Sequence, residues 1–522
     1  MKLPVNEAFL VSRPARAAVA AVCFAGGALF AASLPPWNWG FAVLFSLLPL
    51  LWAARVYPWK FRLLCGWVWG LGWTLFAYRF LREIHPAVPF LLAPVLSAWP
   101  AVYALTLGWF VRRPKRERVD WRDELLCALA AAALFAVVEW TRCRLFVWND
   151  FSVTMWRYPA VMQIAALTGR YGVTFLLALG SAGIFALSRK KAGLPAFAVA
   201  VAVWAAAVTY GAVKLHAPAK FHEPVQFRAA LLQGDMPQMR RATAEDVAMA
   251  VRTYVDLALA MKEKKPDAIF FPECAVPVPL RSDHPLSEAY RRALAEAVGV
   301  PLVVGTLDFA PDGSGGMTNS ALLVDRSGRI VGKYDKFHRV PYGEYVPFRE
   351  ILPDTLVRAF DMGRDLVAGT EIRPLVLSSD VRIGCAVCYE GVFSYLAAGF
   401  ARNGANVLAA LSNDVWYPES SEPEQHLANA VMRCVETGLP MIRCGNNGGS
   451  GAVTPEGRFT QYVGTPAPRP ELLREAAAGV VEVTLEKHPE PTVFVRFGNW
   501  IVILCGLFLA ALAAWRYARK RA

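Results

Sequence analysis

A cysteine in the C-terminal half of the chain stands where a nucleophile could act. Residues 381–391 carry an apolar, β-type run into Cys388 and then, from Gly391, into a helical pattern. A thiol at a strand-to-helix turn lies near exposed backbone N–H groups, which lower its pKa and can bind a developing oxyanion. The pattern therefore favours nucleophilic catalysis by Cys388, with a lowered thiol pKa.

Two other segments place acid, base and cationic groups next to expected strand ends. Glu273 follows the apolar run 268–271 directly, and residues 334–344 bring Lys336, His338 and Glu344 together between Pro and Gly breakers. Loops at strand ends commonly carry functional side chains. Taken alone, each segment also has an ordinary explanation, as a solvated strand end or as a charged hairpin. Their chemistry therefore depends on whether the fold brings these side chains close to Cys388.

The pair Cys385-x-x-Cys388 also permits a redox or a zinc interpretation. An odd separation along a strand sends the two side chains to opposite faces, and no second C-x-x-C or spaced His pair completes a zinc site. Both interpretations are therefore disfavoured. Five of the ten cysteines lie in residues 215–497, and this odd number predicts at least one free thiol there.

Further polar clusters follow in the same half of the chain. Ser412-Asn413-Asp414 follows an apolar run, His426 belongs to a helical pattern that carries several charged residues, and Asn446-Asn447-Gly448 reads as a turn. A polar helix face and a turn are the ordinary structural explanations for such clusters.

The elements that must position these residues alternate between short β-rich runs and amphipathic helices. This alternation predicts an α/β layered domain. The expected strands are 225–232, 268–271, 301–305, 320–324, 331–334, 381–387, 407–411, 441–444 and 480–485. The expected helices are 243–264, 285–298, 391–403 and 423–437, the first marked by a capping-box-like start at Thr243.

The rest of the chain is apolar enough to cross a membrane repeatedly. The chain of 522 residues is 55% hydrophobic and only 19% charged, and its mean hydropathy is +0.33. A span needs about 20 apolar residues, with about 17 as the usual lower limit. Eight segments are expected, of which the second and fifth are short: 17–33, 40–54, 63–80, 89–111, 125–140, 171–187, 194–213 and 500–515.

Charge separates the two parts and orients the first. Residues 1–214 and 498–522 hold 26 Lys+Arg against 8 Asp+Glu, whereas residues 215–497 hold 29 against 34. The excess of positive charge in the chain, +13 in total, thus comes from the membrane part. The soluble-looking part is mildly acidic, so the net charge does not indicate nucleic-acid binding. Nineteen of those 26 basic residues flank alternate spans on one side. Since Lys and Arg are retained in the cytoplasm, both termini are expected there and residues 215–497 outside.

Taken in order, several segments resemble the nitrilase superfamily and, with eight spans, its membrane-bound branch, the bacterial apolipoprotein N-acyltransferases. These segments are Leu232–Gln238, Tyr334–His338, Cys388–Glu390, Ser412–Trp416 and Asn446–Gly448. The resemblance implies spans one to seven within residues 1–214, an exported nitrilase-like αββα sandwich at 215–497, and the last span with a basic tail at 498–522.

The resemblance also implies an active site and its substrates. Glu273 would be the general base, Lys336 the oxyanion stabiliser together with the Tyr389 backbone N–H, and Cys388 the nucleophile. Glu344 and Glu390 would support the site. A fatty acyl chain would pass from a phospholipid, with phosphatidylethanolamine the expected donor, through a thioester to the N-terminal amine of the diacylglyceryl-cysteine of an exported lipoprotein. No metal or organic cofactor is implied, and the location would be the bacterial inner membrane with the catalytic domain on the periplasmic side.

The sequence departs from the family pattern near the expected lid, where Arg240-Arg241 is followed by Ala242 instead of an aromatic residue. Two alternative functions stay open. A membrane-tethered amidase would use the same Glu273, Lys336 and Cys388 to hydrolyse small amides. A lipid-binding or transport protein would need polar groups at membrane depth, where Glu139 is the main acidic exception.

Overall fold

The computed structural model describes residues 13–111, 120–217, 221–237, 243–276, 279–280, 285–310, 313–353, 365–417, 419–467, 469 and 473–521. The expected lid position Ala242, with Arg240 and Arg241, lies outside these residues, as does most of the basic cluster at 112–118. The chain divides into two compact units, Met1–Ala217 with Phe497–Ala522, and Pro218–Arg496. We call them the helical unit and the catalytic unit.

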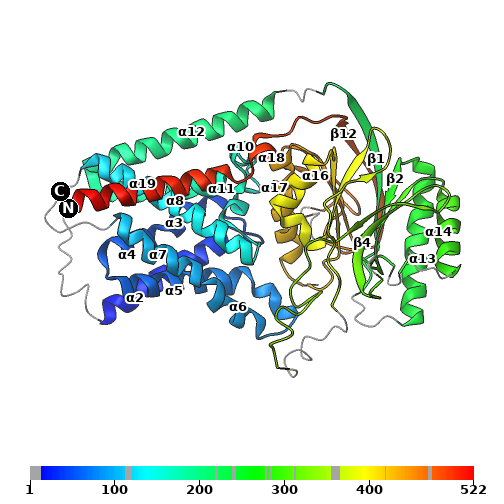
Figure 1. Ribbon diagram of the computed structural model, residues 1–522, viewed down its shortest axis with the longest axis horizontal. Coiled ribbons are helices and arrows are strands. Elements are labelled where there is room, and N and C mark those ends of the chain that lie inside the picture. The colour runs from blue at the N-terminus through cyan, green and yellow to red at the C-terminus, as the bar shows by residue number, and fades with distance from the viewer. Residues whose placement is uncertain are drawn as a thin grey trace. The chain divides into compact units, whose positions relative to one another are not determined.

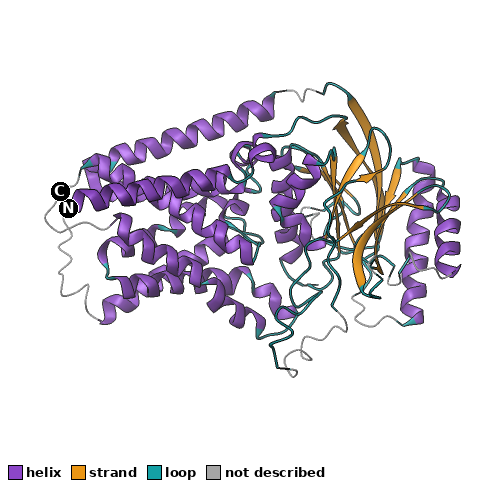
Figure 2. Ribbon diagram, in the orientation of Figure 1, coloured by secondary structure: helices purple, strands orange, loops and turns teal. Residues whose placement is uncertain are grey.

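The helical unit consists of helices joined by short turns (Figures 1 and 2). Its longer helices are α2 (Arg13–Ala32), α4 (Leu48–Val56), α5 (Trp59–Ala77), α6 (Val88–Leu96), α7 (Ala98–Val111), α8 (Trp121–Leu145), α11 (Arg170–Ala186), α12 (Leu194–His216) and α19 (Trp500–Arg521). Its shorter helices are η1 (Gly40–Ala42), α3 (Val43–Ser46), η2 (Arg79–Glu83), η3 (Phe151–Met155), α9 (Pro159–Met162), α10 (Ala165–Thr168) and η4 (Leu187–Ala192).

Six helical segments among the described residues are long and apolar enough to cross a membrane. They are Pro14–Ala32, Val88–Val111, Trp121–Leu145, Arg170–Ala192, Leu194–His216 and Trp500–Arg519, and each coincides with an expected span. The expected third span coincides with α5, which has 19 residues but begins with Lys60 and Arg62 in its first turn. The expected second span, 40–54, is divided into η1, α3 and α4, and the α4 helix begins at Leu48 with Pro49 in its first turn. Because a proline favours the first turn of a helix over its interior, the chain breaks there.

Glycines allow two helices of this unit, α2 and α5, to approach closely. A Cβ added at Gly27 of α2 would lie 1.9 Å from the carbonyl oxygen of Trp69, and one at Gly72 of α5 would lie 2.1 Å from that of Phe24. Small residues let the backbones of apolar helices approach one another, which is how helices associate when no hydrophobic effect drives them together. Larger side chains at either position would push α2 and α5 apart.

Glu139 of α8 is held inside the helical unit by hydrogen bonds. Its carboxylate accepts from the backbone N–H of Phe151 at 2.8 Å and from the hydroxyl of Thr174 at 2.8 Å. The neighbouring Arg142 donates to the carbonyl oxygens of Phe146 and Trp148, at 3.0 and 3.1 Å. These contacts tie the segment after α8 to the helices, so Glu139 has a structural explanation.

The catalytic unit is built on two six-stranded sheets. The first has the order β12-β1-β2-β3-β4-β5 and the second β11-β10-β9-β8-β7-β6. The strands of the first sheet are β1 (Pro224–Gln233), β2 (Ala268–Phe270), β3 (Leu302–Phe309), β4 (Met317–Val324), β5 (Ile330–Asp335) and β12 (Ala477–Glu486). Those of the second are β6 (Leu375–Val376), β7 (Arg382–Val387), β8 (Val407–Ser412), β9 (Met441–Gly445), β10 (Gly451–Val453) and β11 (Phe459–Tyr462).

Both sheets have parallel strands at the centre and antiparallel strands at the edges. Strands β1, β2 and β3 are parallel, as are β7, β8 and β9. The strands that open and close the unit, β1 and β12, pair antiparallel along their whole length, from Pro224 opposite Glu486 to Gln233 opposite Ala477. Parallel central strands send their carboxyl ends to one edge of each sheet, where residues after the strands can meet.

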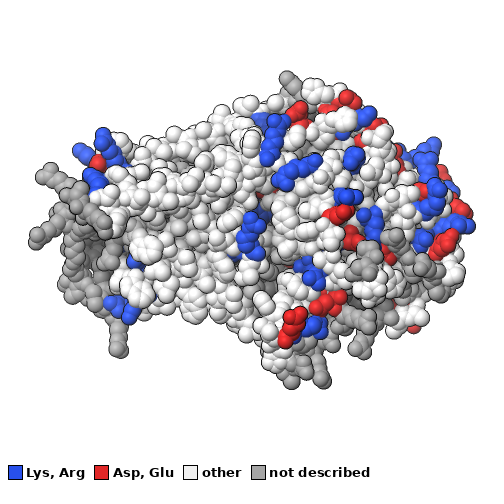
Figure 3. Space-filling view, viewed as in Figure 1, with Lys and Arg blue, Asp and Glu red and all other residues white. Residues whose placement is uncertain are grey.

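Helices cover the outer face of each sheet, which confirms the predicted αββα sandwich (Figures 1 and 2). The first sheet carries α13 (Ala244–Met261), followed by η5 (Lys262–Lys264), and α14 (Pro285–Val298). The second carries α16 (Ser394–Arg402) and α17 (Glu422–Thr437), and α18 (Val493–Phe497) packs near α16. Apolar residues of α13, α14 and the first sheet form one buried core. Charged side chains are dense on the visible surface of the catalytic unit and sparse along the helices of the helical unit (Figure 3).

All nine predicted strands and four predicted helices of this unit are present, with ends shifted by a few residues. The sequence reading missed β6, β10 and β11. These are short strands at the two edges of the second sheet, β6 at one and β10 and β11 at the other, and β10 and β11 carry too few alternating apolar residues to show a period of two.

Candidate active site

The three expected catalytic residues each follow a strand. Glu273 comes just after β2, Lys336 directly after β5, and Cys388 directly after β7, where it begins the short helix η6 (Cys388–Val392). The first two strands belong to one sheet and the third to the other. The charges of Glu273 and Lys336 both act on the Cys388 thiol, so the fold brings the three side chains together from both layers.

Lys336 lies between two carboxylates. Its Nζ is 2.9 Å from Oε1 of Glu344 and 3.4 Å from Oε1 of Glu273, and its side chain is only 1% exposed. Burial alone would lower the pKa of Lys336, but the carboxylates of Glu344 and Glu273 outweigh burial and hold this pKa well above its usual value. A fixed ammonium group therefore stands beside the thiol at physiological pH.

Asn319 of β4 joins the same two carboxylates, and the sequence reading did not find it. Its Nδ2 donates to Oε1 of Glu273 at 2.7 Å and to Oε1 of Glu344 at 2.8 Å. The N–H of Lys336 in turn donates to the Asn319 carbonyl at 2.8 Å. The available signal was the polar run Thr318-Asn319-Ser320 in a strand that is otherwise apolar, because buried polar side chains must find hydrogen-bond partners.

Cys388 has an uncommon backbone conformation. Its φ is +53°, in the left-handed region that costs a residue with a side chain about 1–3 kcal/mol and is concentrated at functional sites. The strand-to-helix turn was predicted correctly. It delivers the thiol from the end of β7 while the chain turns into η6.

The predicted lowering of the thiol pKa is wrong. Burial raises the pKa of Cys388 well above its ordinary value and the Glu273 carboxylate raises it further, while Lys336 and the backbone N–H of Asn413 oppose this effect. The turn after β7 is a five-residue 3-10 helix, so the helix-end effect is small beside desolvation. The thiol is neutral at rest and needs a base to become a nucleophile.

The supporting carboxylates Glu344 and Glu390 hold different parts of the site. Glu344 contacts the Lys336 ammonium, and its Oε2 accepts from the N–H of Val340 at 2.7 Å. Glu390 is buried, and it accepts from the hydroxyl of Tyr334 at 2.9 Å and from the N–H of Val387 at 2.9 Å. Glu390 thus connects the segment around Lys336 with the end of β7. Burial raises the pKa of Glu390 to about 7.

Aromatic rings surround the turn that carries Cys388. The Tyr389 ring meets Phe393 edge to face at 5.0 Å, and the His338 ring lies 3.9 Å from that of Phe393. His338 Nδ1 is 3.0 Å from the hydroxyl of Tyr395. Burial and the nearby Lys336 lower the pKa of His338 to about 4, so this imidazole is uncharged.

The other cysteine of the C-x-x-C pair is enclosed in the sheet. Cys385 is fully buried on β7, and all ten cysteines of the chain are free thiols, as the prediction of a free thiol requires. The two thiols form no redox disulfide here.

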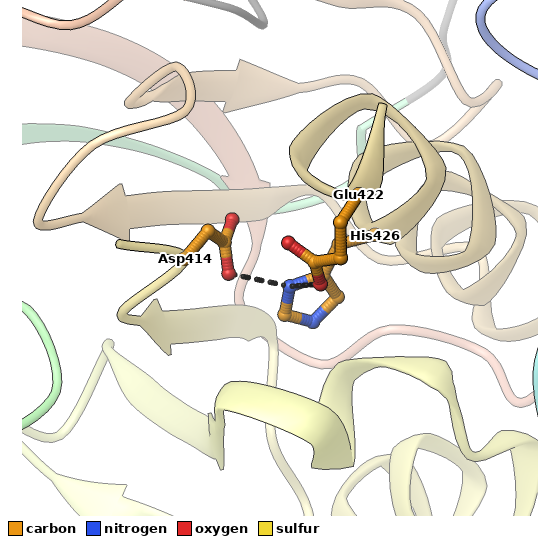
Figure 4. A group of neighbouring side chains, drawn as sticks. All are labelled: Asp414, Glu422 and His426. Atoms are coloured by element: carbon orange, nitrogen blue, oxygen red, sulfur yellow. Dashed lines mark hydrogen bonds and ion pairs between the residues drawn. The ribbon is translucent and has the colours of Figure 1, made fainter. Parts of the chain in front are cut away.

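Asp414, Glu422 and His426 form the one cluster among the described residues whose spacing suits a metal ion (Figure 4). Asp414 already carries a cationic partner, because the Arg443 guanidinium donates to its Oδ2. His426 Nδ1 lies 2.9 Å from Asp414 Oδ1. The arrangement is therefore that of a buried ion-pair network.

The two-layered αββα domain that carries Glu273, Lys336 and Cys388 is of the carbon-nitrogen hydrolase class, as its sequence shows. Residues 228–467 match the carbon-nitrogen hydrolase family, and residues 26–183 match the apolipoprotein N-acyltransferase N-terminal domain. The chain belongs to the apolipoprotein N-acyltransferase family.

Relatives of the same description cover most of the chain. The apolipoprotein N-acyltransferase of Brucella suis is 31% identical over 418 residues, which are 77% of this chain and 76% of the relative. The apolipoprotein N-acyltransferase of Geobacter metallireducens is 29% identical over 438 residues, which are 82% of this chain and 80% of the relative. Among solved structures, an amidase from Nesterenkonia sp. aligns with a TM-score of 0.35 and 19% identity, covering 53% of this chain and 95% of the amidase.

Proposed function

We propose that this chain transfers a fatty acyl group from a phospholipid to the N-terminal amine of an exported lipoprotein, through a thioester on Cys388. The observation that carries the proposal is the neutral thiol of Cys388 beside a buried ammonium, Lys336, in a member of this family. A covalent intermediate divides the difficult transfer from ester to amine into two easier steps.

In the first step, Glu273 accepts the thiol proton and the Cys388 sulfur attacks the ester carbonyl carbon. The oxyanion that forms is stabilised by the Lys336 ammonium and the Tyr389 backbone N–H. The carbon–oxygen bond to the glycerol then breaks, and the proton on Glu273 passes to the leaving alkoxide. The products are a lysophospholipid and a thioester.

In the second step, the lipoprotein amine attacks the thioester carbonyl. Glu273 accepts a proton from the amine, the same donors stabilise the second oxyanion, and the carbon–sulfur bond breaks. The thiolate takes the proton from Glu273, which restores the starting state. Phosphatidylethanolamine is the expected donor, and a diacylglyceryl-cysteine N-terminus is the expected acceptor.

The arrangement across the membrane is part of the proposal. The catalytic unit would lie on the periplasmic side of the inner membrane and both termini in the cytoplasm, because basic residues flank alternate spans. Protease digestion of intact spheroplasts should cleave the catalytic unit and spare an epitope placed at the C-terminus. Protection of the catalytic unit would reverse the orientation.

The test of the chemistry is the intact mass of the purified protein after incubation with phosphatidylethanolamine and no acceptor. Wild type should gain one fatty acyl mass that hydroxylamine removes, and Cys388→Ser should gain none. Cys385→Ser is the matched control, because Cys385 lies on the same β7 strand but is enclosed in the sheet. A diacylated lipopeptide should then discharge the thioester and become N-acylated.

The tethered amidase is the main alternative, and the same preparation separates the two functions. An amidase should hydrolyse small soluble amides in detergent without lipid, and its acyl-enzyme should be discharged by water as fast as by the lipopeptide. The transport alternative is weaker, since Glu139 is engaged in internal hydrogen bonds.

A further inference from the structure

His426 reaches the peptide that follows the nucleophile, although the mechanism above does not use it. It lies on α17 and is buried, and its Nε2 is 3.0 Å from the carbonyl oxygen of Cys388. Its Nδ1 is 2.9 Å from Oδ1 of Asp414 and 3.9 Å from Oε1 of Glu422. Figure 4 shows both carboxylates beside the same ring nitrogen, Nδ1.

The partners of His426 determine its protonation. A carbonyl oxygen only accepts hydrogen bonds, and an ionised carboxylate also only accepts them. The Arg443 guanidinium donates to Oδ2 of Asp414, which favours the ionised form of that carboxylate. Both ring nitrogens of His426 therefore face acceptors, a pattern of hydrogen bonds that the doubly protonated ring, the imidazolium, satisfies at both nitrogens. The charged groups beside the ring include Asp414, Glu422 and, through Asp414, Arg443.

The peptide bond between Cys388 and Tyr389 connects this imidazolium to the reaction. In a trans peptide the C=O and N–H groups point in opposite directions. The Cys388 carbonyl points to His426, so the Tyr389 N–H lies on the opposite edge of the same plane. Cys388 has a left-handed φ of +53°, and the hydrogen bond from His426 holds the peptide that follows it in one orientation.

We propose that His426 is a positioning residue that, as an imidazolium, fixes and polarises the Cys388–Tyr389 peptide so that the Tyr389 N–H binds the oxyanion more strongly. The proposal rests on the proposed function, in which that N–H is an oxyanion donor. A cation at the carbonyl oxygen draws electron density from the amide, and hydrogen bonds in such a chain strengthen one another. The helix α17 thus supplies a positive charge to the site through one peptide group.

The test compares two reactions of Cys388 that differ in one respect. Acylation by p-nitrophenyl butyrate passes through an oxyanion, whereas methyl methanethiosulfonate transfers a methylthio group to the same thiol with no carbonyl involved. Both require loss of the thiol proton, so thiol activation affects both rates equally. The full-length protein in detergent is used, and intact mass relative to Cys388→Ser assigns each product.

Two substitutions separate charge from packing. His426→Gln keeps a neutral donor and should slow acylation about 10-fold, less than the roughly 10²–10³-fold cost of losing an oxyanion donor, while methylthiolation keeps its wild-type rate. Glu422→Gln removes a nearby charge but leaves both close hydrogen bonds of His426. It should slow acylation by a smaller factor than His426→Gln does, and it should leave the rate of methylthiolation unchanged. His488→Gln, at an exposed histidine, is the matched control and should leave both rates unchanged.

Each outcome decides the proposal. Wild-type acylation in His426→Gln would overturn it, and so would a parallel fall of both rates, which would indicate a structural role. If His426→Gln does not fold, Glu422→Gln decides by the same comparison. If the wild-type protein reacts with the p-nitrophenyl ester but not with phospholipid, the phospholipid donor of the proposed function is refuted. The role of His426 is still decided by the comparison of the two reaction rates.

Discussion

Replacing Lys336 by Met tests the centre of the site. The substitution removes the ammonium that lies 2.9 Å from Glu344 and 3.4 Å from Glu273 and keeps most of the side-chain volume. The transition state would lose one oxyanion donor, which costs about 2.7–4 kcal/mol. Since about 1.4 kcal/mol is a factor of ten in rate, acyl-enzyme formation should fall about 10²- to 10³-fold.

The same substitution should reduce stability. Removing one partner of a buried ion pair costs about 3–5 kcal/mol, because Glu273 and Glu344 are left facing each other across Asn319. The raised pKa of Lys336 keeps its contribution constant in wild type up to strongly alkaline pH. Denaturant unfolding of Lys336→Met near neutral pH should show this deficit in unfolding free energy.

Lys333→Met provides the matched control. Lys333 lies on β5, three residues before Lys336, and its Nζ is 2.7 Å from Oδ2 of Asp308 and 3.0 Å from Oδ1 of Asp335. It is a second largely buried ammonium between two carboxylates, but it is not part of the reaction scheme. The variant should lose stability and keep its rate of acyl-enzyme formation, measured by intact mass at a temperature where both variants are folded. Equal rates in Lys336→Met and Lys333→Met would refute the role assigned to Lys336.

Three further substitutions test the surroundings of the site. Glu344→Gln should slow acyl-enzyme formation about 10- to 100-fold, because a charge-assisted hydrogen bond to the ammonium is worth about 1.5–3 kcal/mol; intact mass against time measures this. Glu390 has a pKa of about 7 because of burial, above the unfolded value of about 4.3, so its contribution to unfolding free energy falls as pH rises from about 4 to 7. Thermal unfolding of Glu390→Gln against pH should lack that decline, and an unchanged slope would contradict the assignment. Asn446→Ala should lower the free energy of unfolding by denaturant by about 1–3 kcal/mol. The side-chain oxygen of Asn446 accepts hydrogen bonds from the Tyr254 hydroxyl at 2.9 Å and from the Met236 N–H at 3.0 Å, and both would be lost. A loss below about 0.5 kcal/mol would mean that water replaces these bonds.

Local patterns predicted the framework of the site. The turn at Cys388 and the strand ends at Glu273 and Lys336 follow from runs of apolar residues and from the breakers after them. Neighbouring residues along the chain decide such features, so a single sequence shows them. The same locality explains why β1 and β12 were both predicted, although the chain between them holds all the other strands.

The features that sequence missed depend on contacts between distant elements. His426 looked like part of a polar helix face, yet it is buried because α17 packs against η6. Asn319 was not singled out, because only the fold shows that its amide lies between two carboxylates. The thiol pKa was given the wrong sign for the same reason, since desolvation depends on how both sheets enclose Cys388. The break at Pro49, by contrast, was visible in the sequence and was not used.

The antiparallel pairing of β1 with β12 makes the catalytic unit a modular insertion. The chain enters the unit near Pro224 and leaves it near Glu486, and these two residues are partners in the ladder, about 5 Å apart at their Cα atoms. Cutting the chain at both points would leave a fragment whose ends are already joined side by side. A few residues could bridge the gap left in the remaining chain. The fold therefore permits the catalytic unit to be exchanged for another nitrilase-like sandwich by splicing at this one ladder.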